Sequence, residues 1–273
     1  MPDFSSMLPS ALAAKTQFVT LAGVPALVAH PDWEKPAPAV IWMHGRTVHK
    51  ELDPGRYLRW VRAGIAAVAL DLPGHGARAH PPLHGPEHTL DVVERMLSEL
   101  DKVIEAIGQV TLRGRFDPQR LAIGGMSAGG MVALRRLCDP HPFACAAVEA
   151  TCGDFAALYA PPRSGGSAPA SHPPERVASL DPSRRLETWR PIPILALHSE
   201  ADQWVPFQAQ RAFIDRLQNH YAAIGADPSL VRLHAWPETG APFEHAGFGR
   251  FGPEAKDIQT AFFVRHLRPE EPQ

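Results

Sequence analysis

GGMSAGG, residues 124–130, places one serine between two pairs of glycines. The apolar run at residues 121–123 precedes this stretch, and residues 131–137 follow it with apolar side chains at helical spacing. A linker interpretation fails because a buried strand enters the stretch and an apolar helix leaves it. The stretch therefore predicts a tight strand-to-helix turn in an α/β fold, with Ser127 at its tip.

The spacing of the glycines indicates the chemistry of this turn. Read from Gly125, the residues are Gly-Met-Ser-Ala-Gly, the G-x-S-x-G pattern of a nucleophile elbow. Side chains two residues before and after the serine would collide as the helix packs back on the strand, so glycines stand there. The helix also aims its N-terminal amides at a reacting carbonyl oxygen. Ser127 is therefore the predicted nucleophile.

Strands and helices alternate along most of the chain. Strands are predicted at residues 39–43, 65–70, 120–124, 143–149, 192–198 and 230–236, and a hairpin at 18–21 and 26–29. Helices are predicted before residue 64 and at 90–107, 131–137, 207–217 and 258–266. This alternation predicts a mostly parallel sheet of about eight strands with helices on both faces and an antiparallel edge. We expect one domain over residues 1–273, with a cap-like insertion at about 153–190, where the periodicity is lost.

A serine hydroxyl needs a general base, and that base needs a carboxylate to orient it. Asp202 lies in HSEADQWVP, just past a strand end, where an open α/β sheet builds its site. Glu200 is the alternative acid, and capping or loop structure is the alternative role for Asp202. Among fourteen histidines, His245 lies in the loop before the closing helix and is the predicted base, whereas His234 lies within the last strand and is predicted to be structural.

An oxyanion needs at least two hydrogen-bond donors in fixed positions. The backbone N–H of Ala128, directly after the nucleophile, is one predicted donor, and the backbone N–H of Arg46, after the strand at 39–43, is the other. The Arg46 side chain is either solvated or in contact with an anionic part of the substrate. Phe155, Tyr159 and Trp204 are predicted to line the substrate pocket, together with Trp189 and Phe207, and a place in the ordinary core is the alternative.

Composition excludes several classes of partner. Lys and Arg total 27 against 29 Asp and Glu, without a basic stretch that would follow a phosphate backbone, so no nucleic acid is expected. The apolar runs fall short of the roughly 18 residues that a membrane span needs, and the first residues lack a signal-peptide core, so a cytoplasmic protein is expected. The three cysteines form no CxxC pair and predict buried free thiols, with no metal and no cofactor. A homodimer is allowed.

The motifs MHGRTVHK, LDLPGHGAR, GGMSAGG, HSEADQWVP and EHAGFG occur in the order of the site loops of one superfamily. Over about residues 17–268 the chain resembles the α/β-hydrolase superfamily, in particular its dienelactone-hydrolase-like and prolyl-oligopeptidase-like serine esterases. The resemblance implies Ser127 as nucleophile, Asp202 as acid and His245 as base, with Arg46 and Ala128 at the oxyanion hole. Dienelactone hydrolases proper use a cysteine nucleophile, so Ser127 argues against that activity.

These observations predict a serine carboxylesterase that hydrolyses small to medium carboxylic esters through an acyl-enzyme intermediate. The same residues can release amines, so a small peptidase or amidase of the prolyl-oligopeptidase-like type is the second hypothesis. A non-catalytic binding protein of the same fold is the third. The only partner expected in the first case is a small-molecule ester substrate.

Overall fold

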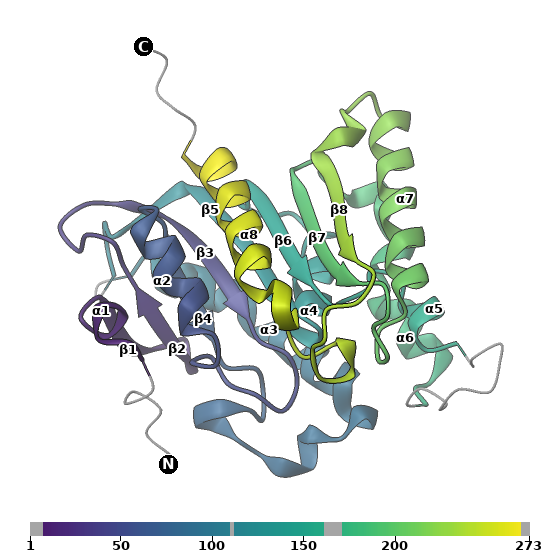
Figure 1. The fold of residues 1–273 in the computed structure, drawn as a ribbon, viewed down its shortest axis with the longest axis horizontal. Helices are drawn as coiled ribbons and strands as arrows, with labels where there is room; N and C mark the ends of the chain where they lie inside the picture. Colours follow the sequence, from purple (N-terminus) through teal and green to yellow (C-terminus); the bar gives the residue numbers. More distant parts are fainter. Residues whose placement is uncertain (1–7, 110–111, 161–170, 269–273) are drawn as a thin grey trace.

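An eight-stranded sheet runs through the molecule in the order β1-β2-β4-β3-β5-β6-β7-β8 (Figure 1). The computed structural model describes residues 8–109, 112–160 and 171–268. The strands β4, β3, β5, β6, β7 and β8 are parallel neighbours, while β1 and β2 pair antiparallel at one edge. The strand bounds are β1 Thr16–Leu21, β2 Val24–Ala29, β3 Ala37–Met43, β4 Ala66–Leu70, β5 Phe116–Met126, β6 Cys145–Glu149, β7 Ile194–Ser199 and β8 Val231–Trp236.

β1 and β2 are antiparallel because a tight hairpin turn connects them. Ala22 and Gly23 connect β1 to β2, with φ angles of 48° and 89°. Two successive residues with positive φ form the kind of two-residue turn whose twist matches that of paired strands. Leu21 consequently pairs with Val24 at the end of the ladder.

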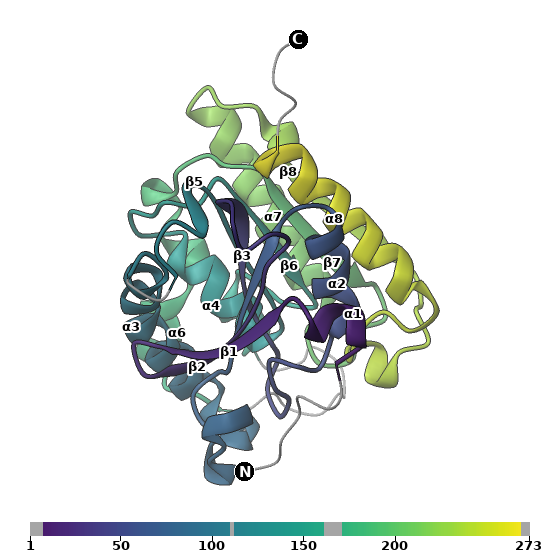
Figure 2. The same cartoon turned by 90° about the vertical axis from the view of Figure 1, so that its left-hand side faces the viewer.

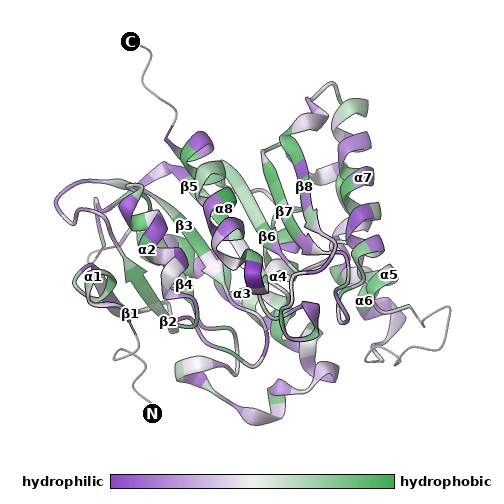
Figure 3. Ribbon diagram, in the orientation of Figure 1, coloured by the Kyte–Doolittle hydropathy of each residue, from purple (hydrophilic) through white to green (hydrophobic). Residues whose placement is uncertain are grey.

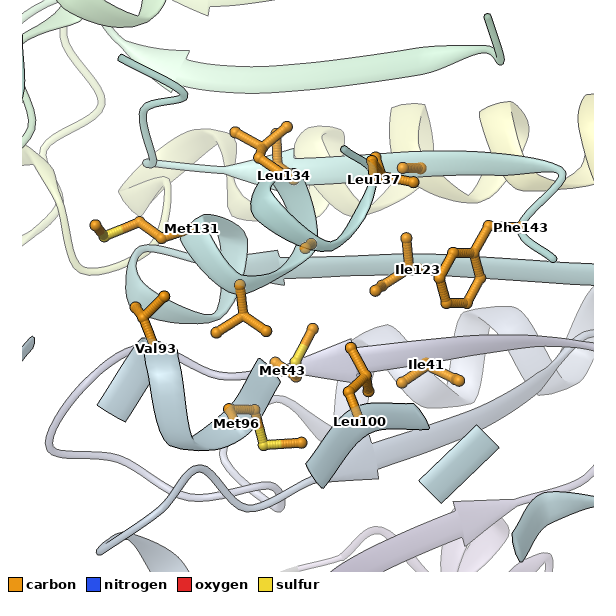
Figure 4. Packing of buried hydrophobic residues seen from close by; sticks show 14 of the residues in the cluster. Ile41, Met43, Val93, Met96, Leu100, Ile123, Met131, Leu134, Leu137 and Phe143 are labelled. Carbon is orange, nitrogen blue, oxygen red and sulfur yellow. The ribbon is translucent and has the colours of Figure 1, made fainter. Parts of the chain in front are cut away.

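Helices cover both faces of the sheet (Figure 2). The helices α1 (Ser10–Ala13), α2 (Pro54–Arg62) and α8 (Gly252–Leu267) lie on one face, and α3 (Thr89–Ile107), α4 (Ala128–Arg136) and α7 (Phe207–Ala223) lie on the other. Because side chains alternate along a strand, Ile41 and Met43 of β3 pack toward α3 and α4 (Figure 4), and Val40 and Trp42 pack toward α2 and α8. Figure 3 shows the resulting pattern, with hydrophobic colour along the central strands and mixed colour on the outer helices.

The predicted α/β architecture with a mostly parallel sheet and an antiparallel edge is confirmed. Several element boundaries differ from the prediction by two or more residues, most of all the start of β5 at Phe116, the start of α8 at Gly252 and the end of α7 at Ala223. The segment predicted as an insertion contains α5 (Phe155–Leu158) and α6 (Pro174–Leu180), followed by 3-10 turns at Pro182–Arg184 and Leu186–Thr188. Residues 161–170 of that segment lie outside the described residues.

Two further predictions concern properties of single side chains and helices. Cys138, Cys145 and Cys152 are buried free thiols, as predicted, and burial raises the pKa of Cys138 to about 12. Within the described ranges, no helix combines the length and the apolar character that crossing a membrane requires.

Candidate active site

Ser127 stands between the last residue of β5 and the first residue of α4. Its backbone has φ of 51° and ψ of −119°, a conformation that non-glycine residues rarely adopt. Two hydrogen bonds hold this turn on the neighbouring strand: the Ser127 N–H donates to the carbonyl oxygen of Glu149 at 2.9 Å, and the Thr151 hydroxyl donates to the Ser127 carbonyl at 2.8 Å. The strained turn is therefore fixed by the end of β6.

All four glycines around this turn occupy positions without room for a side chain. A Cβ atom on Gly125 would lie 2.4 Å from the carbonyl carbon of Gly129, and one on Gly129 would lie 2.3 Å from the carbonyl oxygen of Met43. These contacts confirm the predicted reason for glycine at both positions. The outer pair is equally confined, since a Cβ on Gly124 would lie 2.2 Å from the Ala147 carbonyl oxygen and one on Gly130 would lie 2.7 Å from Thr151.

The structure brings Ser127, His245 and Asp202 together in one hydrogen-bonded series. The Ser127 hydroxyl lies 3.0 Å from Nε2 of His245, and Nδ1 of His245 lies 2.8 Å from Oδ2 and 3.1 Å from Oδ1 of Asp202. A carboxylate only accepts hydrogen bonds, so Nδ1 carries the proton and Nε2 is left to accept from the hydroxyl. The three residues come from the loops that follow β5, β7 and β8, at the carboxyl ends of parallel strands.

The Asp202 carboxylate is itself held in place by its loop. Its side chain is fully buried, and Oδ1 accepts the backbone N–H groups of Trp204 and Val205, each at 2.8 Å. These bonds fix the carboxylate plane and leave Oδ2 directed at His245. The orientation of the imidazole therefore depends on the backbone of residues 202–205 as much as on the carboxylate.

The alternative acid and the second histidine lie in other surroundings. Glu200 is exposed and lines a groove between α7, β8 and α8. His234 lies on β8, where its ring packs against Trp236 with 4.4 Å between ring centroids. Asp202 and His245, the preferred residues at the sequence level, are the ones that the fold carries to Ser127.

His198 is a residue of this site that the sequence analysis did not assign. It is fully buried at the end of β7, its Nε2 donates to the Val205 carbonyl at 2.9 Å, and the same nitrogen lies 3.6 Å from Oδ2 of Asp202. Burial lowers the pKa of His198, although the nearby charge of Asp202 opposes this shift. A neutral His198 supports the loop of residues 202–205 without forming an ion pair with Asp202, so that the Asp202 carboxylate can stabilise a positive charge on His245. The sequence feature that could have indicated this role is the spacing of four residues between His198 and Asp202.

Of the two predicted oxyanion donors, Ala128 directly follows Ser127 in the chain, and Arg46 follows Gly45, which lies next to Ser127. A Cβ on Gly45 would lie 3.4 Å from Cβ of Ser127, so the loop of residues 44–46 runs directly against the serine. Within the described part of the chain, no acceptor takes a hydrogen bond from the backbone N–H of Arg46 or of Ala128. Both donors are therefore unoccupied by the protein's own acceptors.

The Arg46 side chain turns away from its own backbone amide toward another loop. Its Nη1 donates to the carbonyl oxygen of His84 at 2.5 Å, and burial lowers the pKa of the guanidinium. Across the described residues, Arg46 forms no ion pair with a carboxylate. His44 supports the loop from within, because its Nδ1 donates to the Gly45 carbonyl at 2.6 Å and its Nε2 accepts the Leu72 N–H at 3.1 Å.

The aromatic residues predicted to line the pocket fall into different environments. Phe155 is fully buried in the hydrophobic core, so its assignment to the substrate pocket is corrected to a packing role. Trp189 and Phe207 are also buried. Tyr159 is half-buried and packs its ring against His172 at 4.5 Å. Trp204 is 51% exposed, and its ring centroid lies 4.8 Å from that of His245.

A metal site would need several His, Cys, Asp or Glu side chains that point toward one position. Across the described residues, no group of three or more His, Cys, Asp or Glu side chains is arranged to hold a metal ion. The chemistry that the described side chains offer at Ser127 is that of a hydroxyl, an imidazole and a carboxylate.

The chain is similar in sequence and in fold to several known proteins. The esterase YjfP of Escherichia coli (strain K12) is 26% identical over 263 residues, covering 90% of this chain and 97% of the esterase. The crystal structure of TT1662 from Thermus thermophilus is 24% identical with a TM-score of 0.69, covering 93% of this chain and 98% of TT1662. A puromycin-hydrolyzing peptidase of Mycobacterium tuberculosis has a TM-score of 0.71 at 18% identity, covering 96% of this chain and 41% of the peptidase.

These likenesses confirm the predicted α/β-hydrolase fold. Residues 95–270, which are more than half of the chain, match the model of the prolyl oligopeptidase family. The chain therefore belongs to the prolyl oligopeptidase family and is a serine hydrolase.

Proposed function

We propose that this serine hydrolase cleaves small to medium carboxylic esters, with Ser127 as nucleophile, His245 as general base and Asp202 as the group that orients the base. The observation that carries the proposal is the hydrogen-bonded series from the Ser127 hydroxyl at 3.0 Å through His245 to Asp202, on a serine with φ of 51°. The name of the E. coli relative, an esterase that the chain covers almost entirely, favours esters as substrates.

The reaction proceeds in two displacements. The Ser127 oxygen attacks the ester carbonyl while its proton passes to Nε2 of His245, and the N–H groups of Arg46 and Ala128 donate to the oxyanion. When the carbon–oxygen bond of the alcohol breaks, His245 gives that proton to the leaving oxygen. A water molecule then attacks the acyl-enzyme, with His245 again as base, and releases the acid and the free hydroxyl of Ser127.

The proposal is tested by the rate of a variant without the nucleophile. Ser127→Ala is expected to lower kcat for p-nitrophenyl butyrate by about 10⁶-fold, since removing one member of such a set costs about as much as removing all of it. Ser98→Ala is the matched control, because Ser98 is an exposed serine on α3 whose hydroxyl donates to the Arg95 carbonyl. Hydrolysis by Ser127→Ala at the rate of Ser98→Ala would refute the assignment.

A peptidase or amidase is the second candidate, because structural neighbours include a puromycin-hydrolyzing peptidase. The two functions are separated by p-nitrophenyl esters and p-nitroanilides that share an acyl group. An esterase is expected to have the larger kcat/KM on the ester throughout the series, whereas faster turnover of aminoacyl anilides would favour the peptidase. Failure of a fluorophosphonate probe to label Ser127 would instead favour the third hypothesis, a non-catalytic binding protein.

A further inference from the structure

Two exposed aromatic rings stand next to the predicted base. Trp204 and Phe243 are 51% and 54% exposed, and their rings stack with 5.0 Å between centroids and 25° between planes. The Trp204 ring also contacts the imidazole of His245, with 4.8 Å between centroids. A stacked pair of large apolar side chains open to solvent is unusual unless the surface binds something.

The backbone under Phe243 is held in a costly conformation. Phe243 and Glu244 have φ angles of 55° and 51°, and a non-glycine residue in this region costs about 1–3 kcal/mol. Such outliers persist only where surrounding contacts determine them, and they cluster at functional sites. In this conformation the Phe243 ring is exposed and stacks on Trp204.

The Glu244 carboxylate supplies the contacts that hold this conformation. It accepts the hydroxyl of Ser199 at 2.7 Å, the hydroxyl and N–H of Thr239 at 2.7 and 2.6 Å, and the N–H of Gly240 at 2.6 Å. Desolvation opposes the charged form, but these hydrogen bonds outweigh it and lower the pKa of Glu244 to about 2. The Gln203 N–H donates to the Phe243 carbonyl at 3.1 Å and joins the loop of Trp204 to the loop of His245.

The chemistry of the base indicates which half of the substrate meets these rings. After the first displacement His245 carries a proton, and it must deliver that proton to the oxygen of the departing alcohol. The leaving group therefore lies beside the imidazole, whereas the acyl group stays on Ser127. Side chains in contact with the His245 ring, as Trp204 is, adjoin the leaving group.

We propose that Trp204 and Phe243 form a leaving-group subsite that favours esters of aromatic alcohols. This inference rests on the proposed esterase function and specifies its substrate class. An aromatic pair contributes a preference of several-fold to about tenfold beyond the burial of apolar area. The Glu244 carboxylate anchors the loop that carries Phe243 through its hydrogen bonds to Ser199, Thr239 and Gly240.

The experiment compares 2-phenylethyl, 2-cyclohexylethyl and ethyl acetate, which share an acyl group. The wild-type protein is expected to have a kcat/KM about five- to tenfold higher for the phenylethyl ester than for the cyclohexylethyl ester. Phe243→Ala is expected to bring the ratio of kcat/KM for the phenylethyl ester to kcat/KM for the cyclohexylethyl ester down to about one, because the stacked ring is lost. Phe243→Leu, which keeps apolar bulk and loses the aromatic ring, is expected to behave in the same way.

The matched control is Phe18→Ala. Phe18 is 45% exposed on β1, at the opposite edge of the sheet from β8, and its removal is expected to change none of the three rates. If both Phe243 variants lowered kcat/KM by the same factor for all three esters, Phe243 would only position His245, and the subsite would be refuted. A preference that followed an aromatic acyl group, measured with ethyl 3-phenylpropanoate against ethyl 3-cyclohexylpropanoate, would refute it too.

The leaving-group subsite and the esterase function would be refuted by different results. A protein that hydrolyses ethyl acetate normally but does not distinguish phenylethyl from cyclohexylethyl esters would overturn the subsite and leave the esterase function intact. A protein that hydrolyses no ester at all, with Ser127 unlabelled by a fluorophosphonate, would overturn the proposed function and the subsite with it.

Discussion

Arg46 has two hydrogen-bond donor groups in different surroundings. Its backbone N–H belongs to the loop that runs against Ser127, whereas its guanidinium donates to the carbonyl of His84. Because a side-chain substitution keeps the backbone amide, the contributions of the two groups can be measured independently. The same separation does not exist for Ser127 or His245, because the proposed reaction involves their side chains.

Arg46→Ala is expected to leave kcat/KM for a neutral p-nitrophenyl ester within a few-fold of the wild-type value. Loss of one oxyanion donor typically costs about 10²- to 10³-fold, so the two cases are well separated. Arg46→Lys is the control that keeps the charge. A drop of 100-fold or more in Arg46→Ala alone would show that the side chain contacts the substrate or that its bond to His84 holds the loop.

Single residues differ in how well the sequence predicts them. Ser127, Asp202 and His245 were predictable as neighbours because each follows its own strand and parallel strands end at one edge. Phe155 was misassigned, since sequence does not distinguish an aromatic side chain in the core from one at the surface. No periodicity in the sequence predicts the backbone conformation of Glu244, because that conformation depends on partners such as Ser199, which is 45 positions away.

At the scale of elements, a buried polar cluster joins α2, β6 and α8. Arg56 donates to the Glu149 carboxylate at 2.6 and 2.8 Å, and Gln259 donates to the same carboxylate at 2.9 Å. Burial disfavours the charged guanidinium, but the charge of Glu149 outweighs it and raises the pKa of Arg56. The backbone carbonyl of Glu149 accepts the Ser127 N–H, so this cluster also supports the strained turn.

Arg56→Met is expected to lower the free energy of unfolding by about 3–5 kcal/mol, because it leaves the buried Glu149 carboxylate without its cation. Arg59→Met on the same helix is the matched control. Arg59 pairs with Asp257, whose side chain is 67% exposed, and such a pair contributes about 0–1 kcal/mol. Urea unfolding of both variants measures the difference, and equal losses would contradict the role given to the cluster.

The elements themselves were predictable where their apolar pattern is strong. The spacing of apolar residues in α3 and the continuous apolar runs of β3 and β4 located these elements within a few residues. The start of β5 was missed because Asp117, Pro118 and Gln119 interrupt its apolar pattern. α6 is short and has only Val177 and Leu180 as buried side chains, so its contacts with the core were visible only in three dimensions.

Across the whole molecule, burial keeps several histidines neutral. Desolvation lowers the pKa of His75 and of His141 to about 4, and it is the first cause of lower pKa values at His30, His172, His198 and His266. The unfolded chain takes up protons at these histidines near pH 6.5, whereas the folded chain resists them to lower pH. Acid therefore favours the unfolded state over this range.

The free energy of unfolding is expected to fall steadily from about pH 6.5 to pH 4, before the strongly paired carboxylates are protonated. Urea unfolding at pH 7, 6, 5 and 4 measures this decline. His75→Gln is expected to make it shallower, since the His75 side chain is buried and would no longer titrate. Stability that is constant, or that rises, between pH 7 and pH 5 would contradict the expectation.

The backbone of Ser127 has a consequence for selection on this protein. At φ of 51° and ψ of −119°, glycine would be free of the strain that serine carries. A chain optimised for stability alone would place glycine at this position and would lose the hydroxyl that we propose as the nucleophile. Under the proposed function, the serine is an example of a trade-off between stability and function, because the residue that weakens the fold locally is also the proposed nucleophile.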